Sequence, residues 1–356
     1  MRSLALRLFV LWGWRRALTA FIAGALSSLA QAPFHFFPIL FLSIPVLIWL
    51  LDGIGGQKET PGRGFRQAAF TGWCFGFGYF LGGLYWIGLA FLVDAKQFAW
   101  MMPFAVVLLP LGLACFTAIS TGIYYLLWRP NNFRILTFAC LFVFGEWLRG
   151  HIFTGFPWNL FGYSFAFSDV LIQPAALVGI YGLSFLCLLA ASCFALTAET
   201  ENETFLKKFT GPLLGSSVLI VIFSYGAFRL NSAKDEHVEE VSLRIVQPNI
   251  PQKEKWDPAN RSKILSQFIR LTNKPTSPQT MGVESATHII WPEVALPILI
   301  LRDEAVLSAI AAMLPENRRL ITGTIRYDKA VHSPDSKAYN SIVVLNDQAK
   351  PLAIYD

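Results

Sequence analysis

The chain has 356 residues, a mean hydropathy of +0.49 and only 15% charged residues. This composition excludes an intrinsically disordered protein and argues against an ordinary soluble enzyme, in which about 25% of the residues are charged. Residues 1–233 hold 14 of the 29 basic and 8 of the 23 acidic residues, so the net charge of +6 belongs to this part. With no basic stripe or reader motif, we do not expect nucleic-acid binding.

Seven apolar segments follow one another in the first 233 residues, and a helix of about 20 apolar residues can cross a bilayer. They are residues 17–33, 36–51, 68–93, 100–128, 133–149, 170–197 and 209–229. The sequence therefore predicts a helical transmembrane domain over 1–233. Five glycines in the third segment have the spacing that lets helices approach closely: Gly72, Gly76, Gly78, Gly82 and Gly83.

Basic residues in the connecting segments predict the orientation. One side holds Arg2, Arg7, Arg15, Arg16, Lys58, Arg63, Arg66, Arg129, Arg134, Lys207 and Lys208, and the other holds Lys96, Arg149 and Arg229. By the positive-inside rule the N-terminus is cytoplasmic, and seven spans place everything after Arg229 on the opposite side. An alternative is a signal peptide ending at Ala30-Gln31-Ala32, whose removal would spoil this alternation.

The cysteines and histidines predict no metal site. All five cysteines lie in apolar segments, where a thiol behaves as a small hydrophobic group. The histidines are scattered, and no metal-ligand spacing occurs.

The composition changes after Arg229. Residues 234–240 form a charged linker, and residues 241–356 alternate between strand-like and helix-like runs. We predict strands over 241–246, 287–291, 320–325, 341–345 and 351–356, with helices near 260–272 and 303–314. This alternation is typical of an α/β layer architecture. The last strand is followed by no closing helix, so the domain is expected to be incomplete.

Three stretches contain residues suited to chemistry. The first is Gly145-Glu146-Trp147-Leu148-Arg149-Gly150, followed by an aromatic loop, Thr154 to Ser164, that suits a lipid interface. Glu146 and Arg149 share a helix face, where an ionisable pair is either functional or merely self-neutralising. The second runs from Gln247 through Lys255-Trp256-Asp257-Pro258. Its simplest interpretation is a rigid turn with no catalytic role. The third, Trp291-Pro292-Glu293, places a carboxylate after a buried strand. This carboxylate is either a catalytic base or an ordinary surface residue.

Together these stretches resemble the apolipoprotein N-acyltransferases. The resemblance covers almost the whole chain and includes Gly323-Thr324 and Tyr339-Asn340-Ser341. It implies a multi-span helical membrane domain followed by a nitrilase-like αββα domain that faces the periplasm of a bacterial inner membrane. It also implies transfer of an acyl chain from a glycerophospholipid to the amine of an S-diacylglyceryl cysteine in an apolipoprotein, with no cofactor and no metal.

The resemblance implies a Glu-Lys-Cys triad, in which Glu is the base, Cys forms a thioester and Lys stabilises the oxyanion. Glu293 matches the base. Trp256 matches a tryptophan that helps to shape the active site. Substrate-binding roles are implied for Arg149, Phe156, Pro157 and Trp158.

The sequence departs from the family pattern at the other two catalytic residues. Residues 234–356 contain no cysteine, and Lys329, Lys337 and Lys350 do not match the position of the family's lysine. We therefore expect the chain to be inactive alone, as an incomplete record, a decayed or split gene, or a first half completed by a second polypeptide. The alternative functions are a non-catalytic lipid-binding membrane protein and, less favoured, a nitrilase-like amidase.

Overall fold

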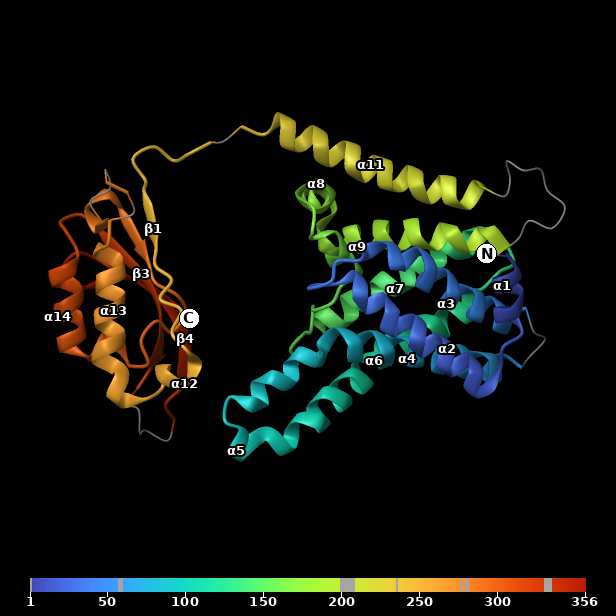
Figure 1. The fold of residues 1–356 in the computed structure, drawn as a ribbon, viewed down its shortest axis with the longest axis horizontal. Helices are drawn as coiled ribbons and strands as arrows, with labels where there is room; N and C mark the ends of the chain where they lie inside the picture. The colour runs from blue at the N-terminus through green and yellow to red at the C-terminus, as the bar shows by residue number, and fades with distance from the viewer. Residues whose placement is uncertain are drawn as a thin grey trace. The chain divides into compact units, whose positions relative to one another are not determined.

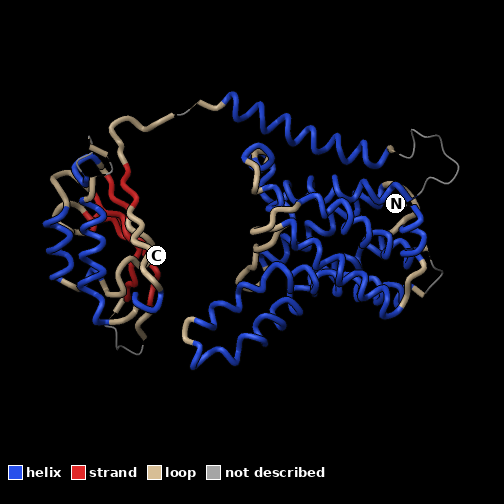
Figure 2. Tube along the Cα trace, in the orientation of Figure 1, coloured by secondary structure: helices blue, strands red, loops and turns tan. Residues whose placement is uncertain are grey.

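The computed structural model describes residues 2–56, 60–198, 209–234, 236–275, 277–278, 282–329 and 335–356. The topology residues Lys58, Lys207 and Lys208 lie outside the described residues, as does Asp235 of the expected linker. The chain separates into two compact units, Met1–Ala233 and Lys234–Asp356, and each is considered by itself. Unit 1 is helical, and unit 2 contains all the described strands (Figures 1 and 2).

Unit 1 consists of α-helices with short 3-10 segments at several of their ends. The α-helices are α1 (Arg2–Phe9), α2 (Gly13–Ser27), α3 (Leu40–Gly55), α4 (Pro61–Leu84), α5 (Ala95–Phe98), α6 (Met102–Leu127), α7 (Phe133–His151), α8 (Asp169–Ile172), α9 (Ala175–Cys193) and α11 (Thr210–Ser232). The 3-10 segments are Ser28–Ala30, Phe37–Ile39, Tyr85–Leu92, Ala99–Met101, Phe161–Phe165 and Phe194–Ala198.

Within the residues that the structure describes, five continuous helical stretches are long and apolar enough to cross a membrane. They are Phe37–Gly55, Pro61–Leu92, Ala95–Leu127, Ala175–Ala198 and Thr210–Ser232. The other two predicted spans are also helical but differ from these five. Helix α2 has only 15 residues, and α7 has 19 residues with three charges, Arg134, Glu146 and Arg149.

Helix α4 packs closely against α2 on one side and α6 on the other. A Cβ atom added at Gly72 would lie 2.0 Å from Thr121 Oγ1 of α6, and one at Gly78 would lie 2.1 Å from the Phe21 carbonyl oxygen of α2. Thr121 Oγ1 also donates to the Ala68 carbonyl of α4 at 2.9 Å. The predicted packing role of the glycine stripe is therefore confirmed at both helix contacts.

Unit 2 is a five-stranded sheet with two helices against one face. Its strands are β1 (Leu243–Ile245), β2 (His288–Ile290), β3 (Arg319–Tyr327), β4 (Ala338–Leu345) and β5 (Pro351–Tyr355), and its longer helices are α13 (Arg261–Asn273) and α14 (Glu304–Met313). A four-residue helix, α12 (Gln252–Lys255), follows β1. The spatial order is β1-β2-β3-β4-β5, parallel through β3 and antiparallel after it.

The core of unit 2 lies between the helices and the sheet. Figure 1 shows α13 and α14 on the same side of the strands. Phe268 of α13 and Ile310 of α14 are fully buried together with Leu320 of β3. On the sheet's other face, Ile245 is 74% and Ile342 is 49% exposed. One face of the sheet thus forms a core, and the other presents apolar side chains to the surroundings.

Candidate active site

Glu293 lies in a turn just beyond the carboxyl end of β2. Trp291, two residues earlier, is buried and donates from Nε1 to Thr272 Oγ1 at 3.0 Å, which fixes the strand exit against α13. The Trp291 N–H also donates to the Ile321 carbonyl of β3 at 2.9 Å. The carboxyl ends of parallel strands are where α/β sheets form their sites, so the predicted position of Glu293 at a sheet edge is confirmed.

Two polar side chains from distant segments reach the Glu293 turn. Asn340 of β4 donates from Nδ2 to Glu293 Oε1 at 2.6 Å. The Lys255 ammonium lies 3.5 Å from the Glu293 carbonyl oxygen. Asn340 therefore holds one carboxylate oxygen in a fixed direction, while Glu293 itself remains exposed. Neither partner was among the predicted site residues, although both lie in stretches cited for the resemblance.

A close backbone contact holds the Glu293 turn against β3. A Cβ added at Gly323 would lie 2.7 Å from the Glu293 Cα and 2.8 Å from the Val294 nitrogen. These are backbone atoms, so the turn itself would have to move to admit a side chain. The Ala295 N–H donates to the Gly323 carbonyl at 3.2 Å and closes the contact. Gly323 therefore determines how closely the Glu293 turn lies against the sheet. In the sequence it stands out only as part of a Gly-Thr pair.

Trp256 comes directly after Lys255 in the chain, and its side chain is half exposed. The Lys255 nitrogen lies 6.0 Å from the centre of the Trp256 ring, within range of a weak cation–π contact. Lys255 thus contacts both the Trp256 ring and the backbone of the Glu293 turn. These contacts bring the second and third sequence stretches to one edge of unit 2.

The end of β5 is tied to β3 and β4 by a charged contact. The Arg326 guanidinium donates to both carboxylate oxygens of Asp356, and Ser341 Oγ donates to Asp356 Oδ1 at 2.6 Å. Arg326 also lies over the Tyr339 ring at 4.8 Å. The Arg326 guanidinium, with help from the Ser341 hydroxyl, lowers the pKa of the Asp356 carboxyl. This cluster fixes the edge of the sheet next to Asn340.

In unit 1, Glu146 and Arg149 hold the aromatic loop that follows α7. Arg149 Nη1 donates to the carbonyl oxygens of Phe156 at 2.8 Å and Trp158 at 2.5 Å. Glu146 Oε1 accepts the Phe161 N–H at 2.8 Å. Both side chains are buried, at 6% and 2% exposure. The pair therefore does more than neutralise itself, because each charge is hydrogen-bonded to the loop backbone.

The predicted lipid-contacting residues divide into two groups. Pro157 and Trp158 line a cavity of about 750 Å³, together with Tyr85 and Trp86 from the 3-10 segment that follows α4 and His35 from the segment after α2. Trp158 is 54% exposed, and its ring lies 5.5 Å from that of Trp86. Phe156 instead packs against the core of unit 1, and the Arg149 guanidinium lies over the Phe80 ring at 4.9 Å. Phe156 and Arg149 thus occupy positions that support the loop rather than line this cavity.

The arrangement in unit 2 supplies a carboxylate with one oxygen bonded to Asn340 and an ammonium beside the backbone of the same turn, and an exposed carboxylate of this kind suits proton transfer. In the described part of the chain, no three His, Cys, Asp or Glu residues are grouped so that they could hold a metal ion. The cysteines all lie in unit 1, so no thiol stands beside Glu293 among residues 234–356.

Comparison with known proteins gives one consistent family. Residues 23–193 match the family model of the apolipoprotein N-acyltransferase N-terminal domain. The chain is 40% identical to an apolipoprotein N-acyltransferase of Rhodopseudomonas palustris and 43% identical to one of Bradyrhizobium diazoefficiens, over 100% of this chain and 66% of each relative. A Brucella melitensis apolipoprotein N-acyltransferase is 41% identical over 99% of this chain and 65% of its own length. The chain thus spans just under two thirds of these relatives.

Proposed function

Because this chain belongs to the apolipoprotein N-acyltransferase family, we propose that it supplies the lipid-binding unit and the general base of an enzyme that N-acylates lipoproteins. It is a bacterial membrane protein, and its described part contains five helices that are long and apolar enough to cross the bilayer. The observation that carries the proposal is the Glu293 carboxylate, held by Asn340 at the carboxyl end of β2. The proposed donor is a glycerophospholipid, and the proposed acceptor is the N-terminal S-diacylglyceryl cysteine of an apolipoprotein.

The proposed chemistry has two acyl transfers. Glu293 takes the proton of a cysteine thiol, and the thiolate attacks an ester carbonyl of the phospholipid. The C–O bond breaks, the lysophospholipid leaves as an alcohol with that proton, and a thioester remains. The lipoprotein amine then attacks the thioester, forming the amide and restoring the thiol. The thiol and the oxyanion-stabilising lysine have no counterpart among residues 234–356, so we propose that another segment supplies them.

The proposed lipid site is the cavity lined by Pro157 and Trp158. Its aromatic walls suit the glycerol and upper acyl region of a phospholipid at a membrane interface. In the proposed orientation the N-terminus is cytoplasmic, and the cavity, the end of α11 and unit 2 are periplasmic. Arg149 and Phe156 position the cavity wall, and Trp256 borders the catalytic carboxylate. The bilayer supplies the donor laterally.

The test is N-acylation of lipoproteins in bacteria depleted of their own enzyme. Two proteins are expressed, the 356-residue chain and the same chain joined after Asp356 to the remaining third of the Rhodopseudomonas palustris relative. Mass spectrometry of the lipoprotein N-terminal peptide measures the acylated fraction. Of the two proteins, we expect only the joined one to restore acylation. Glu293→Gln in the joined protein should reduce the acylation rate about 10²-fold or more.

Glu284→Gln is the matched control, since Glu284 is an exposed carboxylate just before β2. Acylation by Glu293→Gln equal to that of Glu284→Gln would exclude Glu293 as the base. Failure of the joined protein, despite its presence in the membrane, would favour the second candidate, a non-catalytic membrane protein. The observation favouring that candidate is the cavity of about 750 Å³ in unit 1, combined with the absence of any cysteine from residues 234–356.

A further inference from the structure

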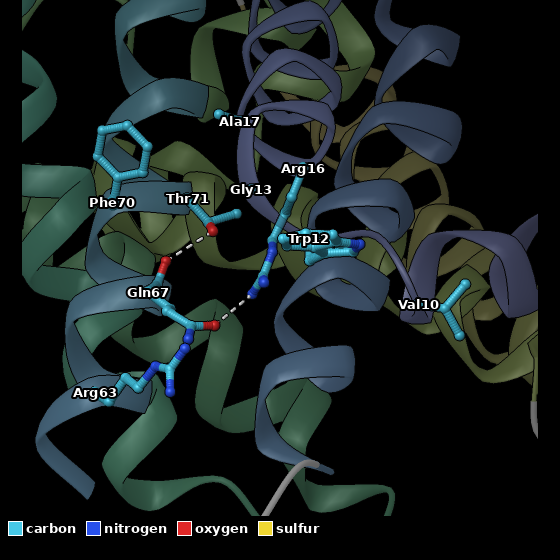
Figure 3. A pocket seen from close by; sticks show the side chains of 9 residues that line it. All are labelled: Val10, Trp12, Gly13, Arg16, Ala17, Arg63, Gln67, Phe70 and Thr71. Atoms are coloured by element: carbon cyan, nitrogen blue, oxygen red, sulfur yellow. Dashed lines mark hydrogen bonds between the residues drawn. The ribbon is translucent and has the colours of Figure 1, made fainter. Parts of the chain in front are cut away.

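Two further cavities of unit 1 differ in the groups that line them. One, of about 510 Å³ at the N-terminal ends of α2 and α4, has polar groups that bond to one another. Arg16 Nη1 donates to Gln67 Oε1 at 3.0 Å, and Thr71 Oγ1 donates to the Gln67 carbonyl at 2.8 Å (Figure 3). The other, of about 430 Å³, is a groove between α9 and α11 with almost entirely apolar walls. The proposed acyl transfer uses neither cavity, and the apolar groove is the one that suits a lipid chain.

The groove lies between two membrane-crossing stretches, Ala175–Ala198 and Thr210–Ser232. One face of α11, from Leu214 to Tyr225, forms one wall, and the other wall includes Leu186 of α9. Tyr225 lies 11 residues after Leu214, which is about 16 Å at 1.5 Å per residue. This length is about half of a hydrocarbon core of about 30 Å. The groove therefore has the depth that the acyl chains of one leaflet occupy.

Close backbone contacts hold α11 in place at both ends of the groove. A Cβ added at Gly215 would lie 2.5 Å from the Ala190 carbonyl oxygen of α9, and one added at Gly226 would collide with the Val170 carbonyl of α8. Between these contacts α9 is interrupted at Gly179, where a φ of 65° favours glycine. The contacts at the two glycines therefore fix the walls of the groove, and the interruption of α9 shapes the wall opposite α11.

A cation stands at one end of the groove. Arg229 lies one turn after Tyr225, in the last turn of α11, and is exposed. Its Nη1 donates to Oε1 of Gln173, the residue directly before Pro174 of the groove lining. The amide of Gln173 is a neutral acceptor, so this bond orients the guanidinium and leaves its positive charge in place. At the end of a membrane span a guanidinium lies at headgroup level, where it suits phosphate oxygens.

We infer that the groove binds one acyl chain of a bilayer glycerophospholipid, and that Arg229 binds the phosphate of the same lipid. The apolar walls match the chain, the length of the groove matches one leaflet, and the cation matches the charge of the phosphate. This lipid is separate from the proposed acyl donor, because the groove and the cavity of Pro157 and Trp158 share none of their described lining residues. Its chain fills the space between α9 and α11 and stabilises their packing.

Photo-crosslinking of the full chain in detergent tests the acyl-chain contact, with a phosphatidylglycerol that carries a diazirine on its acyl chain. Val221→Trp fills the groove from α11, and Leu177→Trp fills it from α9. Ile220→Trp is the matched control, because Ile220 is 63% exposed against 68% for Val221 but does not line the groove. We expect both groove variants to reduce crosslinking to residues 174–186 and 214–225 about tenfold or more, and the control to change it little.

Arg229→Gln tests the phosphate contact. Its control is Lys96→Gln, which removes one positive charge from an exposed position on another helix. We expect Arg229→Gln to reduce crosslinking of the phosphatidylglycerol probe to the groove about tenfold, and Lys96→Gln to leave it unchanged. A fatty alcohol with the same diazirine has no phosphate, so its crosslinking should be the same in both variants.

Three results would overturn the assignment. Equal crosslinking in Val221→Trp and Ile220→Trp would mean that the probe samples only the outer surface of the helices. Equal crosslinking of the phosphatidylglycerol probe in Arg229→Gln and Lys96→Gln would exclude the phosphate contact. A dimer of the chain that Val221→Trp dissociates and Ile220→Trp leaves intact in native mass spectrometry would assign the groove to a second copy.

Crosslinks to residues 157–166, beside the proposed substrate cavity, serve as an internal reference. They should be equal in all of these variants, which shows that unit 1 is folded. Because they report on the proposed donor site separately, failure of the proposed function and failure of the groove assignment give different results.

Discussion

Replacing Arg149 by methionine should release the aromatic loop after α7. The change removes two charge-assisted hydrogen bonds, to the carbonyls of Phe156 and Trp158, and the contact with the Phe80 ring. Hydrogen bonds to charged groups contribute about 1.5–3 kcal/mol each, and breaking a buried charged pair costs about 3–5 kcal/mol in total. Because methionine keeps part of the packing, we expect the free energy of loop opening to fall by about 3 kcal/mol.

Hydrogen exchange of residues 152–166 in the detergent-solubilised full chain measures this change. Two amides report on it, the Phe161 N–H bonded to Glu146 and the Phe156 N–H bonded to the Arg149 carbonyl. A loss of about 3 kcal/mol corresponds to exchange roughly 10²-fold faster. Arg229→Met is the matched control, because Arg229 lies on α11 and donates to Gln173. Exchange in this loop that is no faster in Arg149→Met than in the control would refute the anchoring role of Arg149.

Three further outcomes are expected. Gly323→Ala in the joined protein should displace the Glu293 turn, at a cost of about 1–3 kcal/mol, and reduce the acylation rate; an unchanged rate would mean that the turn tolerates the methyl group. Trp158→Ala should raise the KM for phospholipid more than it lowers kcat, and the reverse result would argue against a binding role. Since Arg326 lowers the pKa of Asp356, their contact should stabilise β5 above about pH 4 and be lost as the pH falls through that lowered pKa. Exchange in β5, corrected for intrinsic rates, should therefore become faster on acidification, and Asp356→Asn should remove that response.

Local patterns predicted the elements well. The helix near 260–272 is α13, which its apolar periodicity predicts, and the strand-like run at 287–291 contains β2, which its short length and β-branched residues predict. The glycine spacing of α4 likewise predicted close helix contacts, since only small residues permit such an approach. The spans α2 and α7 differ from the other five, although all seven were predicted from the length of an apolar run. That length takes no account of the charges in α7 or of the early end of α2.

The contacts of the site depended on features that local patterns do not contain. The Asn340 bond to Glu293 joins residues 47 positions apart and requires β4 to lie in register beside β3. The spacing of Glu146 and Arg149 suggested an interaction between the two side chains, but the loop backbone takes up both charges. A loop with many backbone groups to satisfy competes effectively for a nearby charge, and spacing along a helix cannot show this.

The spatial order of the strands in unit 2 is the same as their order along the chain. As the polypeptide emerges during synthesis, each strand after β1 therefore meets a neighbour that is already available, and no strand must be inserted between two others. The antiparallel half, β3 to β5, needs only local hairpin closure, whereas β1 to β3 must wait for their helical crossovers. Low contact order in this half favours rapid formation, so we expect the β3–β5 ladder to form before β1 and β2 join the sheet.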